Sequence, residues 1–141
     1  MARREREAPV TAEFRAGSMR ELGGALAFVD QVCAGVEADT ALAVRLAIEE
    51  AFTNIYKHGY AGGEGPVAVR VDVAPRQIVA ILVDEAPAFD PTDAPAPDLD
   101  SPWDQRRAGG LGCHLLRQMM DEVKYARREH GNVLTLLKTR A

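Results

Sequence analysis

Cysteine is scarce in this chain of 141 residues, because only Cys33 and Cys113 occur. Their spacing matches neither a zinc ligand pair nor a Cys-x-x-Cys redox motif. A framework of disulfides is therefore not expected. The default compartment for such a chain is the reducing cytoplasm.

Long apolar runs and an excess of positive charge are also missing. No run approaches the roughly 20 apolar residues that a membrane-spanning helix needs. The first residues, "MARREREAPV", are basic and lack the apolar segment of a signal peptide. The formal net charge is −4, which argues against binding along a nucleic-acid backbone. We expect neither a membrane nor a nucleic acid as a direct partner.

What the chain does contain is the composition of an ordinary globular domain, with 47% hydrophobic and 27% charged residues. Its length is sufficient to bury a core and is typical of one domain. We expect a short N-terminal tail over residues 1–9 and a single domain over 10–141.

Helical periodicity and capping signals predict two helices in the first half. Ser18 followed by Glu21 forms a capping box, which starts a helix that runs to about residue 36. Asp39 or Thr40 caps a second helix, which stops near Gly59. The second helix contains the stretch "LAIEEAFTNIYKHGY", in which polar residues interrupt a helix that otherwise packs well.

Alternating apolar residues predict the strands, over 10–16, 67–73, 77–84 and a closing hairpin in 124–138. The strand over 77–84 is apolar on both faces, so we place it centrally. A third helix follows Gly112 and extends to Val123, and Gly131 supplies the turn of the hairpin. The order predicts an α+β two-layer sandwich, with about three helices on one face of a mixed, mostly antiparallel sheet.

The second helix carries the first candidate site. Glu50, Asn54 and His58 lie four residues apart, so they form a polar stripe. A carboxylate can take a proton from an attacking hydroxyl, and one turn away an amide oxygen is a suitable ligand for Mg²⁺. Lys57 and His58 could face phosphates. The alternative is an ordinary solvated helix face.

Two strand residues are further candidates. Asp84 ends a buried strand, where its carboxylate could accept a hydrogen bond from an exocyclic amine such as that of adenine, or simply satisfy loop amides. Thr135 has a hydroxyl on a strand position that we take to face inward. It could contact a ligand edge, or it could be packed like most strand threonines.

The segment "RRAGGLGCHLL", 106–116, is a candidate phosphate-binding loop. Glycines before a helix let backbone amides approach a phosphate, and the helix N-terminus favours negative charge. The segment is not a Walker loop, and it is not a dinucleotide fingerprint because it follows a loop and not a strand. A flexible linker is the alternative.

Four motifs occur in a specific order: "EEAFTNIYKH", "VDEAPAFDP", "GGLGCHL" and "NVLTLLK". This order resembles the N box, the first and second glycine boxes and the terminal threonine strand of the GHKL (Bergerat-type) ATPase superfamily. Within it, the chain is similar to the bacterial anti-sigma-factor serine/threonine kinases, the RsbW and SpoIIAB-like group. The resemblance extends from about residue 10 to 139.

The resemblance implies a role for each matching residue. It makes Glu50 the general base and Asn54 the Mg²⁺ ligand, with Lys57 and His58 near the phosphates of ATP. Asp84 would read the adenine amino group. The ATP lid would cover about residues 90–108. The other nucleotide-binding positions that it implies are Ala86, Phe89, Arg106, Gly109, Gly110, Leu111, Gly112, Cys113 and Thr135.

Ala86 departs from the motif of the family, which has glycine at this position. A methyl group there removes some close approach of the backbone, and it penalises a positive φ. We therefore expect nucleotide binding to be weakened or reshaped.

The function that the resemblance implies is transfer of the ATP γ-phosphoryl group to a serine or threonine of a STAS-type anti-anti-sigma protein. The same protein would sequester a sigma factor and form a homodimer. The alternative is a non-catalytic switch protein of the same fold, in which nucleotide only modulates the affinity for a partner.

Overall fold

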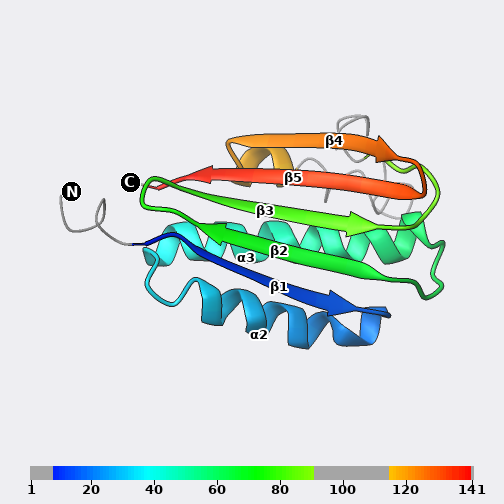
Figure 1. Ribbon diagram of the computed structural model, residues 1–141, viewed down its shortest axis with the longest axis horizontal. Coiled ribbons are helices and arrows are strands. Elements are labelled where there is room, and N and C mark those ends of the chain that lie inside the picture. The colour runs from blue at the N-terminus through cyan, green and yellow to red at the C-terminus, as the bar shows by residue number, and fades with distance from the viewer. Residues whose placement is uncertain (1–7, 91–114, 141) are drawn as a thin grey trace, which may run out of the picture.

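The computed structural model describes residues 8–90 and 115–140. Its strands form one sheet in the order β1-β2-β3-β5-β4 (Figure 1). Their bounds are β1 Val10–Ala16, β2 Val67–Val73, β3 Gln77–Asp84, β4 Glu122–Arg128 and β5 Gly131–Thr139. Every neighbouring pair of these described strands is antiparallel. The predicted α+β sandwich is confirmed, and β3 is the central strand.

The helices lie together on one face of this sheet (Figure 1). A 3₁₀ turn, Met19–Glu21, leads into α2 (Leu22–Val32), and α3 (Ala38–Asn54) continues into a π-helical turn, η2 (Ile55–Gly59). Helix α2 packs on β1 and β2, whereas α3 packs on β3 and β5. Residues 115–119 are also helical. Among the described helices, none has both the length and the apolar character needed to cross a bilayer.

The core lies between the sheet and the two long helices. Alternate residues of the strands point into it, as the period of two requires. The largest fully buried side chains are Tyr56, Phe52, Ile48, Ile78, Leu82, Leu116, Leu136, Val29, Val44, Val67, Val69 and Val71. Burial of each large aliphatic or aromatic side chain contributes about 1.5–3 kcal/mol, so this layer fixes how α3 lies against β3.

The predicted capping box at the start of the first helix is confirmed. The backbone N–H of Ser18 donates to Glu21 Oε2 at 3.2 Å, and the N–H of Gly17 donates to the same oxygen. These bonds satisfy amides that the first helical turn leaves free. The helix is shorter than expected, since α2 ends at Val32.

The predicted N-cap of the second helix, Asp39 or Thr40, is wrong by two or three residues. Helix α3 begins at Ala38, with Glu37 at the N-cap position. The reason is a long-range ion pair: the buried Arg140 guanidinium donates from Nη2 to Glu37 Oε2 at 2.9 Å and from Nε to Oε1 at 3.2 Å. A pattern read along the local sequence does not contain this contact.

Two predictions about the C-terminal part also need correction. Val123 lies in β4, paired with Leu136, and not in a helix. Gly131 is the first residue of β5, and positive φ angles in the described residues occur only at Ala61 and Gly62. A Cβ added to Gly131 would lie 1.7 Å from the carbonyl oxygen of Asp84. Glycine is needed here for close backbone approach, not for a turn.

Candidate functional site

Glu50 and Asn54 lie one turn apart on α3, as their spacing predicts. Asn54 is buried and Glu50 is partly buried. Burial raises the pKa of Glu50, the nearby Glu49 raises it further, and Lys57 opposes the change. A carboxylate with a raised pKa is a stronger proton acceptor than an exposed glutamate.

The π-helical turn η2 changes the direction of the residues that follow Asn54. Its backbone closes by a hydrogen bond from the Tyr60 N–H to the Ile55 oxygen at 2.8 Å. Because this turn winds more loosely than an α-helix, His58 leaves the straight line of i, i+4 positions that the sequence predicts. Lys57 is exposed at the same turn.

His58 contacts the loop that follows β3. Its ring stacks on Phe89, with centroids 5.1 Å apart and planes at 21°. Burial lowers the pKa of His58, and the charge of Lys57 lowers it further. The imidazole is therefore neutral at pH 7. No described residue forms a hydrogen bond with its buried Nε2.

Asp84 lies on the helix-facing side of the sheet, at the end of β3, and is 5% exposed. Its Oδ1 accepts two hydrogen bonds, from the Ala86 N–H at 2.9 Å and from Asn132 Nδ2 at 2.8 Å. Among the described residues, none donates to its other oxygen, Oδ2. The carboxylate is thus held by one oxygen, and the second remains an acceptor.

Ala86 does not suffer the backbone penalty that we expected. Its φ is not positive, because positive values in the described residues occur only at Ala61 and Gly62. Its methyl group is buried and lies against Gly59, where an added Cβ would be 3.1 Å from the Ala86 Cβ. The absence of a side chain at Gly59 therefore leaves room for the methyl group of Ala86.

The prediction that Thr135 faces inward is wrong. In β5 the buried residues Leu134 and Leu136 face the helices, so Thr135 between them lies on the open face, opposite Ile81. The β5 residue beside Asp84 is Asn132, which is 4% exposed. Asn132 is not among the residues that the sequence predicts for the site. The sequence feature that could have identified it is a polar residue at an inward-facing position of β5, where the other buried, inward-facing side chains are apolar.

The structure brings Asn54 and Asp84 together. They line a cavity of about 20 Å³ between α3 and the ends of β3 and β5. Phe89 and Asn132 line the same cavity. Residues from the N-box and first-glycine-box segments therefore converge, although 30 positions of sequence and two strands separate them. The positions Arg106, Gly109, Gly110, Leu111, Gly112 and Cys113 lie outside the described residues.

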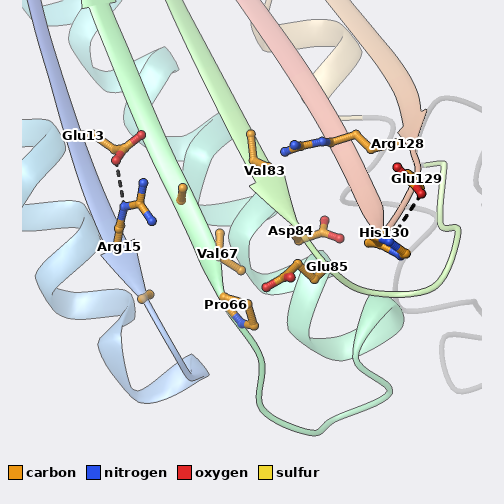
Figure 2. A pocket seen from close by; sticks show the side chains of 12 residues that line it. Glu13, Arg15, Pro66, Val67, Val83, Asp84, Glu85, Arg128, Glu129 and His130 are labelled. Carbon is orange, nitrogen blue, oxygen red and sulfur yellow. Dashed lines mark hydrogen bonds and ion pairs between the residues drawn. The ribbon is translucent and has the colours of Figure 1, made fainter.

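A larger cavity, of about 490 Å³, lies at the same end of the sheet (Figure 2). Its lining holds four carboxylates and two arginines; Arg15 contacts Glu13 at 2.9 Å, and His130 lies 3.7 Å from Glu129. Of the residues that the sequence predicts for the site, only Asp84 borders it. The smaller cavity on the helix side is therefore the candidate functional site.

Known proteins share the sequence pattern of this chain. The pattern of the histidine kinase-like ATPase domain matches residues 14–138. The chain is 34% identical over 93 residues to the serine/threonine-protein kinase BtrW of Bordetella bronchiseptica, across 64% of this chain and 65% of that protein. It is 36% identical over 88 residues to the serine-protein kinase RsbW of Bacillus velezensis, across 57% of this chain and 54% of that protein.

A solved structure shares the fold. The crystal structure of the RsbU and RsbW domains of Rv1364c from Mycobacterium tuberculosis matches 96% of this chain and 34% of that one, with a TM-score of 0.62 and 18% identity. The chain spans less than two thirds of the length of the two kinases. Since the family pattern runs from β1 to β5, through both long helices, the chain belongs to the family of histidine kinase-like ATPase domains.

Proposed function

We propose that this protein is an ATP-dependent serine/threonine protein kinase. The observation that carries the proposal is the convergence of Asn54 and Asp84 on one cavity, with Glu50 one helical turn before Asn54. The names of the relatives, which are serine or serine/threonine kinases, support the same reaction.

Asp84 would bind the adenine base. Its Oδ1 is occupied by two donors of the protein, so an exocyclic amine would donate to Oδ2. A carboxylate only accepts hydrogen bonds, which favours an amino group over the carbonyl group that other purines carry at the same position. The nearby ring of Phe89 would border the same site.

Asn54 would hold Mg²⁺ through its amide oxygen. Among the described residues, no three or more His, Cys, Asp or Glu side chains gather to hold a metal. A site with one protein oxygen and ligands from water and phosphate suits Mg²⁺, which keeps several waters. The bound ion would neutralise charge on the phosphates. The exposed Lys57 would add positive charge to the same side of the site.

Glu50 would act as the general base. The hydroxyl of a serine or threonine would give its proton to the Glu50 carboxylate as its oxygen forms a bond to the γ-phosphorus of ATP and ADP leaves. Phosphoryl transfer needs positioning and charge stabilisation more than covalent help. The partial burial of Glu50, which raises its pKa, suits proton transfer near neutral pH.

The partners that we propose follow from the resemblance. A STAS-type anti-anti-sigma protein would supply the hydroxyl, and a sigma factor would compete with it for this protein. A homodimer in the cytoplasm is the proposed state. A structure with either partner would test these assignments separately from nucleotide binding.

Thermal unfolding with nucleotide tests the proposal. We expect saturating Mg-ATP or Mg-ADP to raise the melting temperature. At a nucleotide concentration of one hundred times Kd, binding should add about 2.7 kcal/mol to the free energy of unfolding. Asp84→Asn replaces one acceptor oxygen by a donor and should abolish the shift. Asp72→Asn, on β2 and ion-paired with Arg70, is the matched control and should keep it.

Phosphotransfer to a STAS-type partner then separates the kinase from the switch protein. Transfer of the γ-phosphate supports the kinase. A normal thermal shift without transfer would leave the non-catalytic switch protein. The absence of any shift with wild-type protein would overturn both.

A further inference from the structure

We propose that Asn132 is a positioning residue that sets the selectivity of the site for a base with an exocyclic amine. It would do so by fixing the carboxylate of Asp84 through Oδ1, so that Oδ2 is the acceptor for the ligand. The inference rests on the proposed nucleotide-binding function, because Asp84 has a partner base only if the site binds a nucleotide.

Acceptors surround the nitrogen of the Asn132 amide. Nδ2 donates to Asp84 Oδ1 at 2.8 Å, to the Pro87 oxygen at 3.1 Å and to the Ala86 oxygen at 3.2 Å. A side-chain amide is the only uncharged group of this size that supplies two donors. A leucine or an aspartate at this position would remove this donor, so that Asp84 Oδ1 would keep only the Ala86 N–H and the Ala86 oxygen would keep only Arg127.

Donors surround the oxygen of the same amide. The Tyr125 hydroxyl donates to Asn132 Oδ1, and Arg127 Nη1 approaches it at 3.4 Å. Arg127 Nη1 also donates to the Ala86 oxygen at 2.7 Å. Donors and acceptors are therefore separated on the two ends of the amide, and only one of its two orientations satisfies them.

The turn after β3 is held from its other side as well. The Tyr60 hydroxyl accepts the Glu85 N–H at 2.9 Å and donates to the Pro66 oxygen at 2.7 Å. The N–H of Ala86 occupies Asp84 Oδ1 together with Asn132. Because Asp84 and Asn132 are both shielded from water, the two hydrogen bonds to Asp84 Oδ1 are stronger than they would be at the surface. The carboxylate is thus oriented before any ligand binds.

A fixed acceptor discriminates between bases. An amino group donates to Oδ2, whereas a carbonyl at the same position of the purine brings two acceptors together. A carboxylate that rotates freely would adapt to other bases through water. Asn132 would therefore contribute to selectivity, and only indirectly to affinity for the phosphates.

The experiment compares three diphosphates in the presence of Mg²⁺: ADP, IDP and purine riboside diphosphate, which has hydrogen in place of the amine. Binding is measured by calorimetry for wild type and Asn132→Ala. We expect wild type to prefer ADP at least about tenfold. Asn132→Ala should lower the affinity for ADP about tenfold and leave that for purine riboside diphosphate unchanged. A merely structural defect would weaken all three equally.

Two further variants complete the test. Tyr125→Phe removes one donor to the Asn132 amide and should lower the ADP preference about threefold. Val133→Asn places the same amide on the open face and should leave the preference unchanged. An unaltered preference in folded Asn132→Ala, or in Tyr125→Phe if Asn132→Ala does not fold, overturns the inference. A wild type that binds none of the three diphosphates overturns the proposed function itself.

Discussion

Helix α3 and the turn after β3 reach the same cavity by different means. On α3, the relation between Glu50 and Asn54 is set by one turn of helix. The turn that follows Asp84 has no regular structure, and it is held by the side chains of Tyr60, just after η2, and of residues in β4 and β5. The first arrangement is local, and the second depends on contacts that span up to 48 residues.

This difference decides where a substitution can change the reaction without displacing the neighbouring residues. A side chain on α3 can change while the backbone hydrogen bonds of the helix keep the position of its neighbours. A change near Asp84 alters the contacts that hold the turn itself. We therefore expect a variant of Glu50 on α3 to separate reaction from binding, and variants around the turn to affect stability and binding together.

Glu50→Gln should have the largest effect. Glutamine keeps the shape but cannot accept the proton, so phosphotransfer should fall by about 10²–10⁴-fold, with ADP affinity nearly unchanged. The variant should not be less stable than wild type. A raised carboxyl pKa means that ionised Glu50 costs stability at neutral pH. Single-turnover transfer and thermal unfolding measure the two effects, and Glu49→Gln is the control.

Transfer by Glu50→Gln at the wild-type rate would show that Glu50 is only a polar residue of the helix surface. A large loss of ADP affinity would contradict the separation of reaction from binding on α3.

The pH dependence of phosphotransfer tests whether Glu50 is the general base. Transfer needs ionised Glu50, so the rate should fall about tenfold per pH unit once the pH is below its folded-state pKa. This acid limb should begin above the ordinary pKa of an exposed glutamate, because burial and Glu49 raise it. Glu49→Gln removes the repulsion and should move the limb to lower pH. A limb that does not move contradicts the assignment to Glu50.

Gly131→Ala tests the close approach at the turn. An added Cβ would lie 1.7 Å from the Asp84 oxygen, so the backbone must shift. We expect a loss of about 1–3 kcal/mol in the free energy of unfolding, together with weaker ADP binding. Denaturant unfolding and calorimetry measure both. Gly23→Ala, where no atom lies within 4 Å, is the control and should not be destabilised. Normal ADP binding by Gly131→Ala would show that the turn tolerates displacement.

Ala86→Gly should have a small effect, although it restores the residue that the family motif has. The methyl group packs on Gly59, so its loss should cost about 0.5–1 kcal/mol of stability. The affinity for ADP should change less than about threefold, since Ala86 has no positive φ that glycine would relieve. A tenfold gain in affinity, measured by calorimetry, would instead show that the methyl group obstructs the base.

Thr135→Val should have the smallest effect. The two side chains have nearly the same shape, and Thr135 lies on the face of the sheet away from Asp84. Calorimetry should give an ADP affinity within about twofold of wild type, because no hydrogen bond to the base is removed. Conversely, a tenfold loss would restore the adenine-side role that the resemblance implies for its hydroxyl.

The parts of this molecule that the sequence predicts are those set by local periodicity. Alternation defines β1 and β2 with the correct bounds, and the four-residue spacing defines the pair on α3. Asp84 follows from its place at the end of an apolar strand. Each of these depends on side chains close to one another along the chain.

What the sequence did not predict depends on register between distant strands. A shift of one residue moves every side chain of a strand to the other face, so the sequence alone does not show that Thr135 faces outward and Asn132 inward. The register between β3 and β5 places Asn132 opposite Asp84. That pairing is consistent with the close approach of Gly131 to the Asp84 carbonyl, which no local pattern of β5 reveals.

Because η2 is a π-helical turn, the position of Tyr60 depends on the number of residues between Asn54 and Tyr60. Removal of one residue from this turn would restore a regular α-helix and would leave the apolar core of α3 intact. It would also rotate and withdraw the Tyr60 hydroxyl from the Glu85 N–H. We therefore expect insertions and deletions to be tolerated less well here than substitutions, and proteins that share this turn should align through it without a gap.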